Sequence, residues 1–375
     1  MKGAVITAKT GIADGILNFL ADALDKGFLD ALLLPIRVPA GDSFGYVLIT
    51  ERSLLTEASP FSPVMPIQGA KALSSLTRYG TGTKRIAALL RPCEIRAAVE
   101  LHKLDQLDVE SIFLMSMDCP GVLSLGDYVK DPQKGDAIFE RALKEWNIDS
   151  PRWVCQACDK FSMSYSDLHI GILAAPDSSL FLIPGTVKGE NLLQGLDLEC
   201  GTSVKGWQTR TQKLTEQRRK KRDQMLRDVK GDIRGPDGLL NIFSNCINCH
   251  NCMSVCPVCY CRQCYFDSGA LKLTPDNYLM RADRKGGLRL LPDTLLFQLG
   301  RMSHMSLSCV SCGSCEDACP MAIPVSRVFT LVADSTQKVF DYVAGRNPQE
   351  PLPQVTYKEE ELKEIEKPYL ETYNK

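Results

Sequence analysis

Cysteine is the residue that most constrains this chain. Residues 246–257 read CINCHNCMSVCP and residues 309–320 read CVSCGSCEDACP, so the pattern C-x2-C-x2-C-x3-C-P occurs twice. Residues 241–335 hold eleven of the sixteen cysteines. A single cysteine is usually a small buried apolar residue, which is a fair interpretation of the isolated Cys200. A repeated, regularly spaced set is more typical of metal ligands.

The two repeats predict ligands for two [4Fe-4S] clusters. In the bacterial ferredoxin run, the fourth cysteine of each repeat ligates the cluster of the other repeat. The spacing therefore predicts one cluster on Cys246, Cys249, Cys252 and Cys319, and a second on Cys309, Cys312, Cys315 and Cys256. Zinc is the alternative, but zinc sites with four thiolates usually pair two C-x2-4-C units. Here each repeat places three cysteines close together in sequence, before a fourth, and this pattern favours iron–sulfur clusters over zinc.

The overall composition argues against some classes of protein. The chain carries 44 Lys and Arg against 45 Asp and Glu, whereas a nucleic-acid-binding protein is expected to have a basic surplus. Lys9 and Asp14 interrupt any apolar core of a signal peptide. No stretch approaches the ~18 uninterrupted apolar residues of a spanning helix. We therefore expect a cytoplasmic protein with no membrane span and no nucleic-acid partner.

The first two hundred residues alternate short apolar runs with helical patterns. The apolar runs predict strands at 4–7, 31–38, 85–92 and 111–120. The residues with helical spacing predict helices at 15–29 and 94–106. This alternation is typical of an α/β layer with a parallel or mixed sheet.

Changes in composition predict four parts. They are an α/β domain at 1–205, a charged helical linker at 206–240, an α-helical two-cluster ferredoxin domain at 241–335, and a C-terminal arm at 336–375. The basic run of the linker could dock an acidic partner or a nucleotide, but a solvated helix face is the simpler interpretation. The arm is expected either to lie over a neighbour or to be a disordered tail.

Four upstream segments resemble, in their order, motifs of the beta-subunit family of coenzyme F420 hydrogenases and dehydrogenases. They are RPCEI at 91–95, CPG at 119–121, CQACD at 155–159 and DLHIG at 167–171. The resemblance extends over residues 1–190. It implies an FAD-binding domain with an iron–sulfur cluster beside the flavin, carried here by Cys93, Cys119, Cys155 and Cys158.

The chain departs from this family pattern at three positions. Glu94 stands where glutamine is frequent, Arg91 stands where glycine is common, and Asp159 follows Cys158 directly. Arg91 beside a flavin or cluster would add positive charge and raise its reduction potential. An ordinary surface arginine is the alternative.

The flavin contacts are predicted from two segments. The first strand is not followed by G-x-G-x-x-G, so a standard dinucleotide fold is not indicated. The segment TAKTGIADG at 7–15 joins a predicted strand to a helix, where free N–H groups suit a pyrophosphate. A plain strand–helix turn is the alternative. The candidate contacts are Thr10, Gly11 and Gly15 here, and Ser75 and Thr77 in a second segment.

A two-cluster module added to this family resembles the beta subunit of formate dehydrogenase. The resemblance implies an oxidoreductase subunit that exchanges hydride between FAD and a soluble carrier, either coenzyme F420 or NAD(P)H. Single electrons would then pass through [4Fe-4S] clusters to or from a partner in a hetero-oligomer. The expected partner is a catalytic dehydrogenase subunit or a heterodisulfide-reductase-like complex.

Other roles remain open at this point. The sequence contains no convincing general acid or base and no pterin domain, so the catalytic residues are unknown and formate chemistry would belong to another subunit. A non-enzymatic electron-relay adaptor without its own substrate site is the alternative function. Cys259, Cys261 and Cys264 either ligate a further cluster, with Cys200 as a possible fourth ligand, or are reduced thiols at a docking surface.

Overall fold

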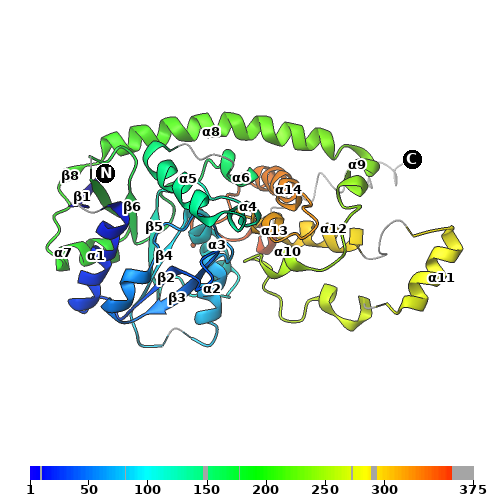
Figure 1. The fold of residues 1–375 in the computed structure, drawn as a ribbon, viewed down its shortest axis with the longest axis horizontal. Coiled ribbons are helices and arrows are strands. Elements are labelled where there is room, and N and C mark those ends of the chain that lie inside the picture. Colours follow the sequence, from blue (N-terminus) through cyan, green and yellow to red (C-terminus); the bar gives the residue numbers. More distant parts are fainter. Residues whose placement is uncertain are drawn as a thin grey trace, which may run out of the picture.

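A computed structural model describes residues 1–8, 11–80, 82–146, 151–176, 178–271, 273–288 and 294–356. Figure 1 shows a sheet with its covering helices on one side, a group of shorter helices on the other, and one long helix along both. We refer to residues 1–203 as the sheet unit and to residues 235–339 as the helical unit.

The sheet unit contains one eight-stranded mixed sheet, in the order β3-β2-β4-β5-β6-β7-β1-β8. The central strands β2, β4, β5 and β6 are parallel, and the other neighbouring pairs are antiparallel. The α/β layer predicted from the sequence is therefore confirmed. The strands are β1 (Lys2–Thr7), β2 (Ala31–Arg37), β3 (Phe44–Ile49), β4 (Ile86–Leu90), β5 (Phe113–Met117), β6 (Leu168–Gly171), β7 (Ser179–Pro184) and β8 (Thr202–Ser203).

Helices cover both faces of this sheet because successive strand residues point to opposite sides. Leu32 and Leu34 of β2 belong to the core on one face, together with residues of α1 (Ile12–Asp25), α5 (Pro132–Glu145) and α7 (Val187–Gly195). Ala31 and Leu33 belong to the other core, together with residues of α2 (Gly69–Leu76) and α3 (Pro92–Lys103). Central strands buried on both sides read as continuous apolar runs, which is why the sequence reveals them.

The helical unit has its own apolar core. Phe243, Phe297 and Phe329 are buried in it beside Cys252 and Cys256. The predicted helical character of this region is confirmed. Its helices are α9 (Gly235–Ile242), α10 (Asn251–Ser254), α11 (Pro275–Lys285), α12 (Thr294–Met305), α13 (Ser314–Asp317) and α14 (Val325–Val339).

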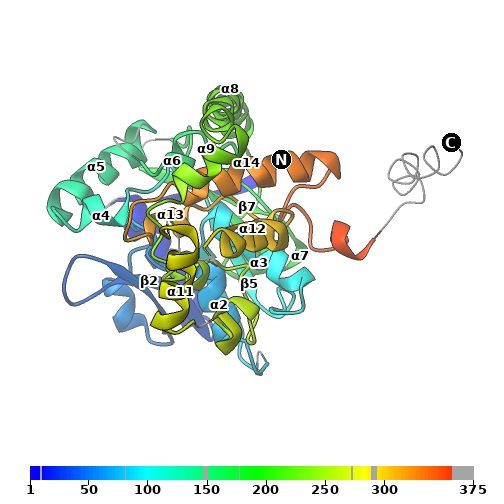
Figure 2. The ribbon, with the colours of Figure 1, turned by 90° about the vertical axis from the view of Figure 1, so that its right-hand side faces the viewer.

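The charged segment forms the long helix α8 (Lys205–Asp232), which lies along one side of both units (Figures 1 and 2). Most of its residues are exposed, but Trp207 is buried in a core of the sheet unit. Further along, Arg222 pairs with Asp334 of α14 at 3.4 Å. This helix is therefore a contact between the units as well as a connection.

The chain returns to the sheet unit after α14. Tyr342, Ala344 and Leu352 join the core that contains α2 and α3. The Arg96 Nε atom of α3 donates a hydrogen bond of 2.9 Å to the carbonyl oxygen of Ala344. This part of the predicted arm packs against the chain itself, and residues 357–375 lie outside the described residues. In the ranges given above, no helix has both the length and the hydropathy of a membrane span.

Candidate functional site

The two cysteine repeats have the same backbone conformation. Asn248 and Ser311, which occupy the same place in the two repeats, have φ of 56° and 57°. His250 and Gly313 are also left-handed, with φ of 59° and 82°, and each is followed directly by a short helix, α10 or α13. Left-handed residues of this kind form concave turns in which N–H groups converge, an arrangement suited to anionic groups. The sequence repeat is thus a structural repeat.

The repeats supply the thiols of two cavities in a crossed arrangement. One cavity is lined by the first set, defined as Cys246, Cys249, Cys252 and Cys319. The other is lined by the second set, defined as Cys256, Cys309, Cys312 and Cys315. In each set, the last cysteine of one repeat meets the first three of the other. The structure therefore brings together the same two groups of four that the ferredoxin rule predicts.

A third cavity is lined by the upstream set, defined as Cys93, Cys119, Cys155 and Cys158. Cys93 lies in the first turn of α3, just after β4, and Cys119 follows β5. Because β4 and β5 are parallel, their carboxyl ends lie at the same edge of the sheet, which places these two thiols together. Cys155 and Cys158 come from α6 (Trp153–Gln156) and the turn after it.

The three sets suit iron–sulfur clusters better than single ions. All sixteen cysteines are free of disulfides. Within the described ranges, no three His, Cys, Asp or Glu side chains are grouped to hold one metal ion. Each set instead surrounds a cavity, as thiolates around a four-iron cube do. Four thiols around one cavity are the ligand set that such a cluster needs.

Burial favours the protonated form of several of these thiols until a metal displaces their protons. Burial raises the pKa of Cys93 and Cys119 in the upstream set. It raises the pKa of Cys155 to about 12 and that of Cys309 to about 11. Metal ligation requires the thiolate, so cluster binding at these sites must release protons.

Arg91 lines the upstream cavity and is only 6% exposed, so it is not an ordinary surface arginine. Its Nη2 atom donates to the Ser62 hydroxyl at 2.9 Å and to the Ser62 carbonyl oxygen. Its Nη1 atom lies 3.8 Å from a carboxylate oxygen of Glu94. Burial alone would lower the pKa of Arg91, but Glu94 and the neighbouring cysteines raise it. The guanidinium therefore stays charged beside the upstream set.

Glu94 is the fully buried counterpart of this cation. It accepts a hydrogen bond of 2.9 Å from the Tyr46 hydroxyl and bonds of 2.6 Å and 2.8 Å from the backbone N–H groups of Gly69 and Arg91. These contacts fix the first turn of α3, which carries Cys93. A carboxylate at this position accepts three donors at once, which gives the departure from glutamine a structural role.

Arg301 plays a comparable part in the helical unit. It is 2% exposed, and its Nη1 atom donates to the sulfur of Cys252 at 3.1 Å. Its guanidinium also lies 4.7 Å from the ring centre of Phe329. A charged donor to a ligand sulfur stabilises the reduced form of a cluster, since reduction adds negative charge. Sequence reasoning missed this residue, because only the packing of α12 brings it to the first set.

A buried polar network holds the segment that carries Cys119. Asp118 accepts hydrogen bonds of 3.0 Å from His169 and 2.8 Å from the Trp207 indole N–H. Burial alone would raise the pKa of Asp118, but His169, Ser162 and Trp207 lower it. His169 lies in the DLHIG motif, so that motif was the available signal for this network. Asp118, His169 and Trp207 were all missed as site residues.

The upstream set and the second set are neighbours. Cys312 lines both of their cavities, and Ser311 beside it does the same. The interface is fixed by Arg152, whose Nη2 atom lies 2.6 Å from a carboxylate oxygen of Asp317. The first and second sets are joined by the chain itself, because each takes its fourth cysteine from the repeat that supplies the other three to its neighbour. The three sets therefore form one connected series.

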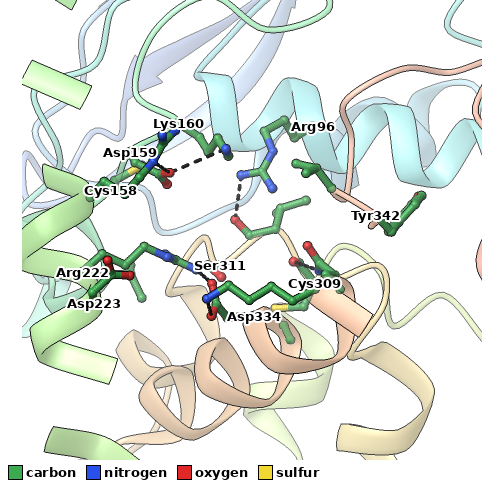
Figure 3. A pocket seen from close by; sticks show the side chains of 17 residues that line it. Arg96, Cys158, Asp159, Lys160, Arg222, Asp223, Cys309, Ser311, Asp334 and Tyr342 are labelled. Atoms are coloured by element: carbon green, nitrogen blue, oxygen red, sulfur yellow. Dashed lines mark hydrogen bonds and ion pairs between the residues drawn. The ribbon is translucent and has the colours of Figure 1, made fainter. Parts of the chain in front are cut away.

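A polar pocket of about 420 Å³ opens between the units, bordered by Cys158 of the upstream set and Cys309 of the second set (Figure 3). Four of its charged side chains form two ion pairs. Lys160 lies 3.6 Å from Asp159, and Arg222 lies 3.4 Å from Asp334. This pocket gives solvent-side access to two thiol sets at once.

The predicted flavin contacts are not gathered at one place in the described residues. Gly11 and Gly15 lie at the start of α1, on one face of the sheet, and Thr10 lies outside the described residues. Ser75 and Thr77 lie at the end of α2, on the opposite face. The Gln68 amide, just before α2, donates to the carbonyl oxygen of Cys93 at 3.4 Å, so the other end of α2 is directed to the upstream set. These contacts remain predictions.

Comparisons with known proteins found one matching family and a similar chain in a solved structure. Residues 242–323 match the family described as a 4Fe-4S dicluster domain, which supports iron–sulfur clusters in the helical unit. The F420-reducing [NiFe] hydrogenase complex of Methanosarcina barkeri contains a chain similar over 63% of this one and 93% of its own length, with 16% identity and a TM-score of 0.48.

Two curated relatives carry a more specific name. The F420-dependent formate dehydrogenase subunit beta of Methanocaldococcus jannaschii is 26% identical over 296 residues, 70% of this chain and 74% of its own. The F420-dependent formate dehydrogenase 1 subunit beta of Methanococcus maripaludis is 26% identical over 369 residues, 88% of this chain and 89% of its own. The resemblance to the coenzyme F420 hydrogenase and dehydrogenase beta-subunit family is thereby confirmed, and the chain is a homologue of its formate dehydrogenase beta-subunit type.

Proposed function

We propose that this chain is the iron–sulfur electron-transfer subunit of an oxidoreductase complex, receiving electrons from a soluble hydride carrier or delivering them to it. The names of its relatives favour coenzyme F420 as the carrier. NAD(P)H is the other candidate. The complex would be a cytoplasmic hetero-oligomer in which the partner is a catalytic dehydrogenase subunit or a heterodisulfide-reductase-like complex.

The observation that carries this proposal is the shared wall of two cavities. Cys312 and Ser311 line both the upstream cavity and the cavity of the second set. Three separate structural metal sites would have no need of such contact. Neighbouring cluster sites within one chain suit electron transfer, because an electron can pass from each site to the next.

Each group of residues has a part in this function. The three thiol sets would each hold one [4Fe-4S] cluster, and such clusters transfer single electrons. Arg91 and Arg301 would hold positive charge beside the upstream and first sets, where it favours the reduced state. Glu94 and Asp118 would fix the backbone that carries Cys93 and Cys119.

FAD is the cofactor that the family resemblance adds. A flavin exchanges two electrons as hydride and releases them one at a time, which links a hydride carrier to one-electron sites. The pocket between the units supports access by a redox group, because it is bordered by Cys158 and Cys309. Its lining holds five basic side chains (Arg96, Lys160, Arg219, Arg222 and Lys338) against three acidic ones (Asp159, Asp223 and Asp334), and this positive excess suits an anionic group.

Anaerobic titration tests this function. The purified full-length chain is mixed with reduced coenzyme F420 or, separately, with NADH, and the bleaching of iron–sulfur absorption is followed. We expect bound flavin and reduction by one of the two carriers. Dithionite reduction is the control that the clusters themselves are competent. Clusters that dithionite reduces, in a protein that has no flavin and responds to neither carrier, would favour the electron-relay adaptor instead.

A further inference from the structure

A second large pocket lies beside the cysteine repeats and is rich in sulfur. It has a volume of about 510 Å³, and one side is formed by the loop that follows the first repeat. That loop contributes three cysteines, Cys259, Cys261 and Cys264, in the spacing C-x-C-x2-C. None of these three belongs to the first, second or upstream set. The pocket therefore concentrates ligand-type residues that the proposed function leaves unused.

The opposite side of this pocket adds further soft donors. His304 and Met305 come from α12, and Met253 comes from α10. The sulfur of Cys259 lies 2.9 Å from that of Met305, and the sulfur of Cys264 lies 3.9 Å from that of Met253. Thiol, thioether and imidazole groups converging on one space are typical of a site for a soft metal group.

Exposure argues against a purely structural role for Cys261, whereas Cys259 and Cys264 also pack against the core of the helical unit. Cys261 is exposed, and Cys259 and Cys264 are only partly buried. Cysteines that fill an apolar core are among the most buried residues. These three are free thiols in the structure, so they do not form a disulfide that would explain their spacing.

The position of the pocket also fits the proposed series of sites. Cys259 follows Cys256 of the second set by three residues, and its N–H lies 3.4 Å from the Cys256 carbonyl oxygen. Arg301, which donates to Cys252 of the first set, lines the same pocket. A group held here would therefore lie next to both sets of the helical unit and would be accessible from solvent.

We propose that Cys259, Cys261 and Cys264 hold a fourth iron–sulfur cluster, with His304 as the fourth protein donor. A single zinc ion on the same residues is the competing occupant. The pocket, of about 510 Å³, has room for the larger group and is lined by three thiols and an imidazole, so the cluster is the occupant that we favour.

Metal analysis of a double variant tests this site. The variant C261S/C264S leaves Cys259 in place, because Cys259 lies against the second set. C200S is the matched control, since Cys200 packs against the core of the sheet unit. The test depends on the difference in iron content between the variant and the wild type, and not on the total iron content. We expect a loss of about four iron atoms and an equal loss of sulfide from the double variant, and none from C200S. An unchanged iron content, or the loss of one zinc ion instead, would overturn the proposal.

Alkylation of the wild-type protein gives a readout that does not depend on a variant folding. Cys261 is exposed, so a free thiol there should react quickly with iodoacetamide under anaerobic, native conditions. We expect Cys261 to be protected until iron is removed by acid and chelator, and modified afterwards, as read by peptide mass spectrometry. Rapid alkylation of Cys261 with the full iron content retained would overturn the site.

Discussion

The upstream set and the two ferredoxin-type sets hold the same four thiols in different ways. The first and second sets are largely local in sequence. In each, three of the four cysteines lie in one short segment, and the two segments have the same backbone conformation. The upstream set is assembled by the sheet, from the end of β4, the end of β5 and the helix α6. One kind of site depends on local sequence and the other on tertiary structure.

This difference predicts how each kind of site fails. The first and second sets exchange their fourth cysteines, so damage to one repeat touches both sets. The upstream set shares only a cavity wall with the second set, through Cys312. It also depends on contacts with distant parts of the chain, such as that between Trp207 of α8 and Asp118 beside Cys119.

The largest expected effect is on iron content. Cys256→Ser removes a ligand that lies in the first repeat but belongs to the second set, so we expect a loss of more than about four iron atoms. Cys119→Ser should remove about four and leave the ferredoxin-type sets intact. Iron and sulfide analysis after anaerobic purification measures both. Equal losses from the two variants would contradict the distinction between crossed and separate sets.

The next effect concerns the contact between the segment after α14 and helix α3 of the sheet unit. Gly345 has φ of 75°, and a Cβ there would lie 2.4 Å from Arg96 backbone atoms. We expect Gly345→Ala to lower the free energy of unfolding by about 3 kcal/mol, from backbone strain together with the clash. Urea unfolding under anaerobic conditions, followed by circular dichroism, measures it.

Gly41→Ala is the matched control for this variant. Gly41 has a similar φ of 80°, but a Cβ there would meet nothing within 4 Å. It should therefore show only the backbone strain, about 1 kcal/mol. A loss at Gly345 no larger than the loss at Gly41 would mean that the return of the chain to α3 contributes little to stability.

A smaller effect is expected on the reduction potential of the first set. Arg301→Met removes a buried cation that donates a hydrogen bond to Cys252. This donor stabilises the reduced cluster more than the oxidised cluster, because reduction adds negative charge. We expect a potential about 60–130 mV more negative, which corresponds to one hydrogen bond from a charged group. Redox titration followed by electron paramagnetic resonance measures it.

Arg327→Met controls for general loss of charge in the helical unit. Arg327 pairs with Glu316 at 3.1 Å, and its side chain is 44% exposed. Solvent screens such a charge, so the shift should be much smaller than that of Arg301→Met. Equal shifts of the reduction potential in the two variants would show that the hydrogen bond to Cys252 has no effect beyond that of charge.

The smallest effect is expected from the corresponding cation of the sheet unit. Arg91 lies beside the upstream set, but its hydrogen bonds go to Ser62 and its charge is partly balanced by Glu94. Arg91→Met should therefore make the potential of the upstream cluster more negative by less than Arg301→Met changes that of the first set. The same titration compares them, and a larger shift from Arg91→Met would show that charge outweighs direct donation to sulfur.

The sequence predicts those parts of the molecule whose geometry is local. Buried strands read as apolar runs because both of their faces are covered, and the cysteine spacing alone indicates the crossed sets. The grouping of Cys93 and Cys119 follows once β4 and β5 are known to be parallel. Family resemblance was needed to add Cys155 and Cys158, because they lie on a helix of only four residues and in the turn after it.

Other features depend on strand order and helix packing, which spacing does not encode. Gly15 and Ser75 were both predicted as flavin contacts from their residue types, yet α1 and α2 cover opposite faces of the sheet. Arg301 is one arginine in an ordinary helical pattern until α12 packs against the first set. The fit of Glu94 depends in the same way on β3, which brings Tyr46 to it.

The helical unit is joined to the sheet unit at both of its ends. α8 leads into it from the sheet unit, and Tyr342 and Leu352 bring the chain back to the core beside α3. A segment anchored twice cannot swing about a single hinge, so the gap between Cys312 and Cys93 is held constant without help from a bound partner. The transfer rate across that gap should therefore be the same in the isolated chain and in the assembled complex.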